Sequence, residues 1–421
     1  MISSLALDSV WIGKERSSLF YYLKKVEDHS EEEADSYLIH EKNYTYFSKG
    51  RIPRLEFKEN GEILSIYELR RFISNYTTFR LATLRHVKTW IGITGTNGKT
   101  TTLYFLEQLV RDNVRIGTIG TLGVRINGEL VKQCFSPNTT LPLFELIRAA
   151  ELCEREKCEV IALEASSIGY VEGRLLGIPF NCMIAHEVSQ DHLDYHLDFE
   201  TYLKIKQEIV QLANIAIVSQ RAFSQGLRTK ENIVVPTQAD VIELNKQCAI
   251  EACKRMGLSY LNAELELPPG RYEKKTFGSF QVVIDYAHTP DALERLVKAF
   301  PKEKLHLVVG CGGDRDRGKR REMARIAFHH AQNCVFTMDN PRYEPCLQPL
   351  LDLQAAAPQA LIIPDRRLAI WYVLETAKEG DTIIIAGKGN EKTMLLHHLS
   401  VPYSDHAVIE EWANQSQRMT L

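Results

Sequence analysis

The stretch Thr94-Gly95-Thr96-Asn97-Gly98-Lys99-Thr100-Thr101 decides the fold of this chain. It follows the apolar run 90–94, which has the pattern of a buried strand, and it precedes a helical pattern. Glycines let backbone N–H groups approach phosphate oxygens, and a helix N-terminus favours negative charge there. Lys99 can reach the outer phosphates and the Thr100 hydroxyl suits Mg²⁺. The stretch therefore predicts a phosphate-binding loop, although its spacing from Gly95 is one residue short of the common pattern and a plain glycine turn is the alternative.

Short apolar runs alternate with helical patterns on both sides of this loop. Such alternation is typical of parallel sheets with crossover helices. The runs are 160–163 and 182–185 and, after a Pro-Pro-Gly break at 268–270, 281–285, 305–310, 334–338, 361–364 and 381–386. We expect an α/β protein of three domains: a small divergent N-terminal α/β domain (1–88), a central parallel-sheet domain of the P-loop ATPase type (89–267) and a Rossmann-like α/β domain (268–421).

The composition is that of a globular protein. The chain has 421 residues, 44% of them hydrophobic and 25% charged, with a net charge of −3. No basic excess favours nucleic acid, no long apolar run predicts a membrane span, and no secretory signal is visible. The nine cysteines contain no CxxC pair, which favours reduced thiols. We expect a cytoplasmic monomer that acts on small molecules, without nucleic-acid or membrane partners.

The loop 94–101 resembles the ATP loop of the Mur ligase superfamily, and later motifs narrow the resemblance to its MurE type over residues 88–220 and 268–395. These enzymes build the peptide of bacterial cell-wall precursors, and the superfamily also includes folylpolyglutamate synthases. The resemblance implies an ATP-dependent, ADP-forming ligase that joins an acceptor carboxylate to an amino acid through an acyl phosphate. It implies ATP and Mg²⁺ as cofactors, with ATP held by residues 95–101.

Two segments that follow predicted strands carry candidate metal ligands. Glu164 ends the run 160–163, at the edge where open sheets bind ligands, and a carboxylate there can hold Mg²⁺. The block Asp191-His192-Leu193-Asp194-Tyr195-His196 resembles the family's block in which the first histidine binds a second Mg²⁺, so the resemblance gives that role to His192. Together with Thr100 and Lys206, these two residues form the predicted metal set.

A lysine interrupts the apolar stripe of the helical pattern 199–210. The stripe runs through Phe199, Tyr202, Leu203, Ile209 and Val210. Lys206 falls within it, whereas Lys204 lies on the polar side. A buried lysine is costly unless its charge is changed or paired, and a lysine that extends to the surface is the alternative. The resemblance identifies Lys206 as the family's carbamylated lysine, in which CO₂ on the amine gives an anion beside magnesium. It makes Lys99, Glu164, His192 and Lys206 the catalytic set.

Two blocks beyond residue 268 resemble the family's nucleotide contacts. Arg271 stands in a Gly-Arg turn whose arginine meets ATP. Asp285 ends a predicted strand, where it could bond ribose hydroxyls, and His288 follows in the same block. Asn245 could match the family's adenine-side asparagine. The predicted ATP contacts are therefore residues 95–101 with Asn245, Arg271, Asp285 and His288.

Two further blocks predict the pocket of the incoming amino acid. The guanidinium of Arg342, in Asp339-Asn340-Pro341-Arg342, can bind a carboxylate through two parallel hydrogen bonds. In MurE-type enzymes this block accompanies meso-diaminopimelate. Gly387-Lys388-Gly389-Asn390-Glu391 resembles a block whose glutamate binds the distal amino group of that substrate. The predicted amino-acid contacts are Asp339, Asn340, Arg342, Gly387 and Glu391.

The acceptor region departs from the family. The resemblance retains Thr139, Thr140, Ser166 and Arg174 as acceptor contacts, although Ser166 could instead cap a helix. Ile168 stands where the family has histidine, and the first 88 residues lack the segments that normally bind uridine diphosphate. Two alternatives therefore stay open: the same ligase chemistry on another acceptor, such as a secondary metabolite or capsule component, or a non-catalytic nucleotide-binding homologue.

Overall fold

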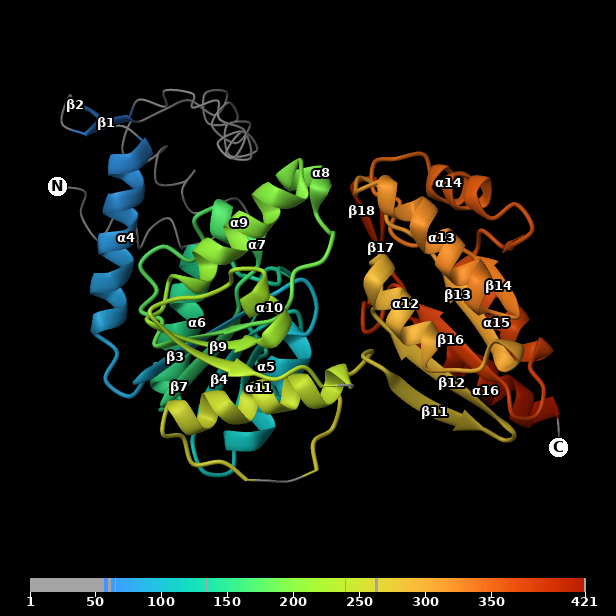
Figure 1. Ribbon diagram of the computed structural model, residues 1–421, viewed down its shortest axis with the longest axis horizontal. Helices are drawn as coiled ribbons and strands as arrows, with labels where there is room; N and C mark the ends of the chain where they lie inside the picture. The colour runs from blue at the N-terminus through green and yellow to red at the C-terminus, as the bar shows by residue number, and fades with distance from the viewer. Residues whose placement is uncertain are drawn as a thin grey trace. The chain divides into compact units, whose positions relative to one another are not determined.

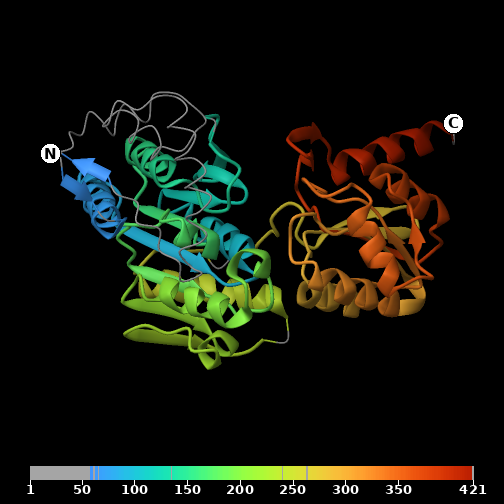
Figure 2. The same ribbon diagram turned by 90° about the horizontal axis from the view of Figure 1, so that it is seen from above.

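The computed structural model describes residues 57–59, 62–64 and 66–419, except 134, 239, 262 and 263. Two compact units divide the chain (Figures 1 and 2). The first extends to Val188 and resumes from Tyr195 to Glu266; the second comprises Ser189–Asp194 and the chain from Leu267 onward. Each unit contains one large, mostly parallel sheet with helices, together with one small two-stranded sheet (β1-β2 or β17-β18), which confirms the predicted fold class. Most of the predicted N-terminal domain lies outside the described residues.

The described residues of the first unit form an eight-stranded sheet in the order β10-β9-β8-β3-β7-β4-β5-β6. Strands β10 through β4 pair in parallel, and β5 and β6 add an antiparallel edge. The strands are β3 Thr89–Thr94, β4 Ile116–Gly120, β5 Gly123–Ile126, β6 Glu129–Leu130, β7 Val160–Glu164, β8 Cys182–Ala185, β9 Ile215–Ser219 and β10 Glu231–Val235. Strands β3, β4, β7 and β8 are almost wholly buried, as expected for a sheet covered on both faces.

Helices cover both faces of this sheet. Helices α5 and α11 pack together on one face, and α6, α7 and α9 lie on the other (Figure 1). The elements are β1 Phe57–Glu59, β2 Glu62–Leu64, α4 Ile66–Ala82, α5 Lys99–Val110, α6 Leu143–Arg155, α7 Ser167–Val171, α8 Leu193–His196, α9 Phe199–Val210, α10 Gln220–Ser224 and α11 Val241–Arg255. The carboxyl ends of β3, β7 and β8 therefore meet at one edge, where the phosphate loop begins.

The second unit has a sheet in the order β11-β12-β16-β13-β14-β15, parallel except for β11. Helices α12, α13 and α14 cover one face, and α15 and α16 the other. The elements are β11 Glu273–Phe277, β12 Phe280–Asp285, α12 Pro290–Lys298, η2 Lys302–Lys304, β13 Leu305–Val309, α13 Gly318–His330, β14 Asn333–Phe336, α14 Gln348–Ala356, β15 Leu361–Ile362, α15 Arg366–Thr376, β16 Thr382–Ala386, β17 Thr393–Leu396, β18 Leu399–Pro402 and α16 Asp405–Met419. Among the described helices, none is long and apolar enough to cross a membrane.

Candidate active site

The predicted phosphate loop joins β3 to α5. Gly95 and Gly98 have φ angles of 134° and 86°, a region that glycine adopts without strain. Gly98 is the N-cap of α5 and, as a glycine, supplies no side-chain cap. The N-terminus of this 12-residue helix favours negative charge, so the position suits an anion. Lys99 folds back and donates to the carbonyl oxygens of Gly95 and Thr96, both at 2.9 Å.

Neighbouring side chains explain why the loop needs glycine. A Cβ on Gly95 would lie 2.7 Å from the Cβ of His186, and one on Gly98 would lie 2.8 Å from Oδ1 of Asn245. Asn245 is buried on α11, directly beneath the loop. The structure thus brings Asn245, predicted from a weak local match, to the loop that carries Lys99.

His186 belongs to this site and was not predicted. It directly follows β8, and its ring pairs with the Thr102 hydroxyl through Nε2 at 2.7 Å. Burial, together with the positive charge of Lys99, lowers the pKa of His186 to about 4. The ring is therefore neutral at neutral pH and supports the loop without adding charge. Its place at the carboxyl end of a buried strand was the available sequence signal.

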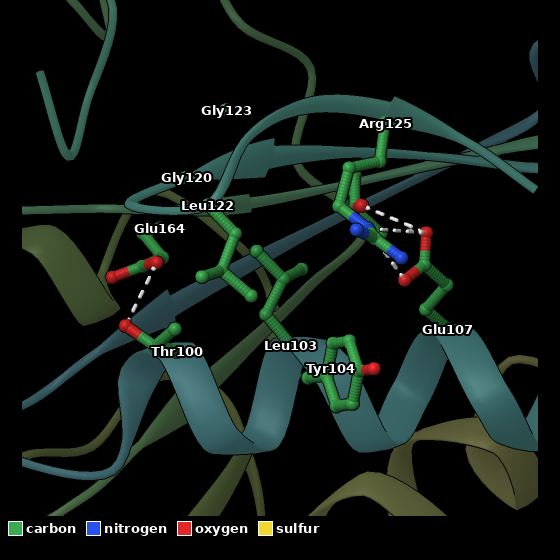
Figure 3. A pocket seen from close by; sticks show the side chains of 10 residues that line it. Thr100, Leu103, Tyr104, Glu107, Gly120, Leu122, Gly123, Arg125 and Glu164 are labelled. Atoms are coloured by element: carbon green, nitrogen blue, oxygen red, sulfur yellow. Dashed lines mark hydrogen bonds and ion pairs between the residues drawn. The ribbon is translucent and has the colours of Figure 1, made fainter. Parts of the chain in front are cut away.

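Glu164 faces the first turn of α5. Its Oε1 accepts hydrogen bonds from the Thr100 hydroxyl at 3.0 Å and from the Thr121 backbone N–H at 2.8 Å. Figure 3 shows the Glu164 and Thr100 side chains at one end of a recess whose other end holds the ion pair of the buried Glu107 with the partly buried Arg125. A hydroxyl and a carboxylate beside a phosphate loop are hard oxygen ligands of the kind Mg²⁺ prefers, so the residues present fit that ion.

Lys206 lies where the helical pattern predicts it. Its side chain is 1% exposed, and its Nζ donates to the Thr94 hydroxyl at 3.2 Å and to the Gly95 carbonyl at 3.0 Å. Lys204 is exposed, as expected. The prediction of the apolar stripe was wrong for Phe199. This residue is 37% exposed, because it is the first residue of α9 and lies beyond the core.

Tyr202 supports this arrangement. It precedes Lys206 by one helical turn, its ring centroid lies 5.5 Å from Lys206 Nζ, and its hydroxyl lies 3.1 Å from that of Thr96. Helix α9 is thereby connected to the phosphate loop through two side chains.

The predicted acceptor residues gather near the end of β7. The Thr140 hydroxyl donates to the Glu164 carbonyl oxygen at 2.7 Å and accepts from the Ser166 N–H at 2.9 Å. Arg174 donates to the Thr140 carbonyl oxygen at 2.7 Å, and Thr139 lies 3.4 Å from the Thr121 hydroxyl. Ser166 is also the N-cap of α7, so the capping alternative is observed.

His192 lies in the segment that groups with the second unit, whereas Thr100, Glu164 and Lys206 belong to the first. Next to it, the buried carboxylate of Asp191 lies 3.5 Å from Lys319 Nζ and 3.7 Å from His288 Nε2. Burial alone would raise the pKa of Asp191, but His192, His288 and Lys319 hold it well below its usual range. The complete four-residue metal set therefore stays a prediction.

The predicted nucleotide contacts of the second unit surround the start of β11 and the end of β12. The Arg271 guanidinium lies 4.2 Å from the centroid of the Tyr286 ring. The Asp285 carboxylate accepts hydrogen bonds from the backbone N–H groups of Tyr272 at 2.6 Å and Ala287 at 2.7 Å. This carboxylate therefore holds together the backbone on both sides of it. Burial raises the pKa of Asp285.

The five predicted amino-acid contacts do come together in the second unit. Asn340 Nδ2 donates to Glu391 at 2.9 Å, and Arg342 donates to the Gly313 carbonyl oxygen at 2.8 Å. A Cβ on Gly387 would lie 2.9 Å from Asp339. Burial lowers the pKa of Arg342, and the nearby Arg315 adds to that shift. This cluster of residues thus carries guanidinium and carboxylate groups, a combination suited to a zwitterion.

Comparison with known proteins agrees with this geometry. Residues 93–236 match the Mur ligase middle domain, and residues 270–389 match the glutamate ligase domain of Mur ligases. The UDP-N-acetylmuramoyl-L-alanyl-D-glutamate–2,6-diaminopimelate ligase of Geobacillus thermodenitrificans is 34% identical over 76% of this chain and 77% of its own length. The corresponding enzyme of Coxiella burnetii is 30% identical over 75% and 76%.

Solved structures agree at the level of the fold. A structure of a UDP-N-acetylmuramoyl-L-alanyl-D-glutamate–2,6-diaminopimelate ligase superposes with a TM-score of 0.54, at 26% identity and over 86% of both chains. A bifunctional folylpolyglutamate synthase/dihydrofolate synthase of Yersinia pestis gives 0.60 at 16% identity, over 84% of this chain and 95% of that one. The chain belongs to the Mur ligase family and is an ATP-dependent ligase that forms amide bonds.

Proposed function

We propose that this ligase joins diaminopimelate to the terminal carboxylate of a UDP-N-acetylmuramoyl dipeptide. The names of its relatives at 30–34% identity support this substrate pair. The observation that carries the proposal is the convergence of Lys99, Thr100, Glu164 and Lys206 on the edge formed by β3 and β7.

In this proposal the N–H groups at the start of α5 and the Lys99 ammonium bind the β- and γ-phosphates of ATP. Lys99 would leave its present carbonyl partners, which offer weaker charge complementarity than a phosphate oxygen. A magnesium ion, held by Thr100 and Glu164 together with phosphate oxygens, would supply charge neutralisation on the transferred phosphoryl group. The acceptor carboxylate attacks the γ-phosphorus, the bond to the bridging oxygen breaks, and ADP leaves.

Lys206 has a chemical role of its own. Its unprotonated amine adds to the carbon of CO₂ and loses one proton, which gives a carbamate anion. Burial of the side chain at 1% exposure restricts access of water, and Nζ lies 3.2 Å from the Thr94 hydroxyl, which itself donates to the Ala165 carbonyl oxygen. This modification would convert a positive group into an oxygen ligand beside the phosphate loop.

The amino acid completes the reaction. The amine attacks the acyl phosphate carbonyl carbon, and the tetrahedral intermediate collapses to an amide and inorganic phosphate. Arg342 would bind a carboxylate of the amino acid and Glu391 its distal ammonium, and Asp339 and Asn340 would complete the contacts to the amino acid. Arg271, Asp285, His288 and Asn245 are the proposed contacts to the nucleoside, and His192 is the proposed additional metal ligand.

A second candidate is the same reaction on another carboxylate acceptor. Ile168 favours it, because this apolar side chain lies in α7, two residues after the Ser166 cap, at the position where the resemblance places a polar histidine. The remaining proposed acceptor contacts are Thr139, Thr140 and Arg174.

The test is phosphate release from ATP with a panel of acceptors, each with and without meso-diaminopimelate, and with mass detection of the product. Diaminopimelate-dependent phosphate release together with the tripeptide-nucleotide mass supports the leading proposal. Product with another acceptor supports the second candidate instead. Phosphate release that requires no amino acid would contradict both.

A further inference from the structure

A fully buried lysine lies next to the proposed amino-acid pocket without a role in the reaction described above. Lys388 is 0% exposed. Its Nζ donates to Glu391 Oε2 at 2.6 Å and to Asn340 Oδ1 at 3.0 Å, and it lies 3.6 Å from Asp339 Oδ1. Three groups predicted to contact the amino acid therefore share one ammonium.

The two oxygens of Glu391 differ in their surroundings. Oε2 accepts hydrogen bonds from Lys388 and, at 2.9 Å, from Asn340 Nδ2. Within the described residues, Oε1 accepts none, although the Glu391 side chain is 29% exposed. One oxygen is thus anchored, and the other is presented outward with its lone pairs open to a donor.

The local backbone keeps Lys388 directed inward. The flanking residues Gly387 and Gly389 have φ angles of 111° and 51°. A Cβ on Gly389 would lie 2.6 Å from the carbonyl oxygen of Gly270. The turn therefore packs closely against Gly270, and the Lys388 side chain that it carries is fully buried among its three partners.

The charges around Lys388 do not balance. Asp339 and Glu391 bring two negative charges, and Lys388 neutralises one of them. Burial alone would raise the pKa of Asp339, but Lys388 and Arg366 hold it lowered, so this carboxylate stays ionised. With Asp339 buried beside Lys388, Glu391 Oε1 is the acceptor that remains for a cation.

We propose that Lys388 is a positioning residue that fixes Glu391 for a distal ammonium of the incoming amino acid and so sets a preference for diamino acids. This inference rests on the proposed function, because it assumes that Glu391 faces the amino acid. It goes further by assigning the selectivity to a residue that does not itself contact the substrate.

A double-mutant cycle tests it. The variants are Lys388→Met, Glu391→Gln, the pair, and Lys392→Met as a control, since Lys392 is exposed and adjacent. We expect Lys388→Met to raise the KM for the preferred diamino acid at least about tenfold, with the KM for ATP within about twofold. In the Glu391→Gln background the same change should alter the amino-acid KM less than about twofold. If Lys388→Met does not fold, Lys388→Gln, which keeps a donor, replaces it.

Each variant is measured with diaminopimelate, lysine and 2-aminopimelate, an analogue that lacks the distal ammonium. A loss confined to the diamino acids, together with non-additivity, supports the inference. Equal losses on 2-aminopimelate, or additive losses, overturn it, because they indicate a general structural role. If the wild type turns over lysine but not diaminopimelate, the proposed substrate is contradicted, and the double-mutant cycle is measured on lysine instead. A wild type that uses only amino acids without a distal ammonium overturns the inference.

Discussion

Lys206 Nζ lies 3.0 Å from the carbonyl oxygen of Gly95, although 111 positions separate these residues in the sequence. Lys99 donates to the same oxygen at 2.9 Å. Two positive charges at one acceptor repel each other, most strongly where burial lowers the local dielectric. Addition of CO₂ to Lys206 would replace one of these charges by a negative one, which gives the proposed modification an electrostatic advantage at this position.

Replacement of Lys206 by alanine should reduce the turnover number by at least about a hundredfold, since removal of an oriented charged group from a reaction centre costs that much or more. High formate or acetate should restore part of the activity by supplying a carboxylate in the space left behind. The measurement is steady-state phosphate release with and without these anions.

Lys204 provides the matched control, because it lies on the same helix and is exposed. Lys204→Ala should retain the turnover of the unmodified enzyme. A ¹³C signal of a lysine carbamate in ¹³CO₂-equilibrated protein should be present in the Lys204 variant and absent in the Lys206 variant. Wild-type turnover of Lys206→Ala would refute the role of this lysine.

Glu164→Gln should raise the Mg²⁺ concentration required for half-maximal activity by about tenfold or more, because the amide keeps the size of the side chain but loses its charge. The Thr100 hydroxyl can still donate to the amide oxygen, so the loop should stay folded. A magnesium titration of the rate measures the effect. Glu159→Gln, at an exposed position that precedes the same strand, should leave the titration unchanged.

The phosphate loop and Lys206 could be predicted because their signals are local. The loop is one contiguous stretch between a buried strand and a helix, and Lys206 differs from Lys204 only by its position in the helical period. The strands β3, β7 and β8 were recognisable because parallel strands buried on both faces form continuous apolar runs.

His186, Lys388 and the β5–β6 edge were not predicted, for a common physical reason. The roles of His186 and Lys388 depend on partners far away in sequence: Thr102 lies 84 positions from His186, and Asn340 lies 48 from Lys388. Strands β5 and β6 are short and partly exposed, so they lack the apolar run that marks a buried strand.

His186 predicts a pH dependence of stability. Its folded pKa of about 4 lies below the usual value of 6.5, so the unfolded chain binds a proton that the folded protein excludes. The stabilisation is therefore complete above about pH 6.5 and is lost as the pH falls toward 4, by up to roughly 3 kcal/mol. The free energy of unfolding, measured in urea across this range, should change less steeply in His186→Gln. His398→Gln, at an exposed position, should keep the wild-type slope.

Arg366 and Asp405 form an ion pair in which both side chains are 0% exposed, with N–O distances of 2.8 Å for both hydrogen bonds. Replacing Asp405 by asparagine leaves the Arg366 guanidinium buried without its countercharge, so the second unit should lose about 3–5 kcal/mol of stability. Arg366 also donates to the Ala386 carbonyl oxygen at the end of β16, so the loss should extend to the sheet. The neighbouring pair of Arg367 and Glu411 is about half exposed, and Glu411→Gln should cost less than about 1 kcal/mol. The free energy of unfolding of both variants is measured in urea. Equal losses in the two variants would mean that burial does not strengthen the dependence of Arg366 on its partner.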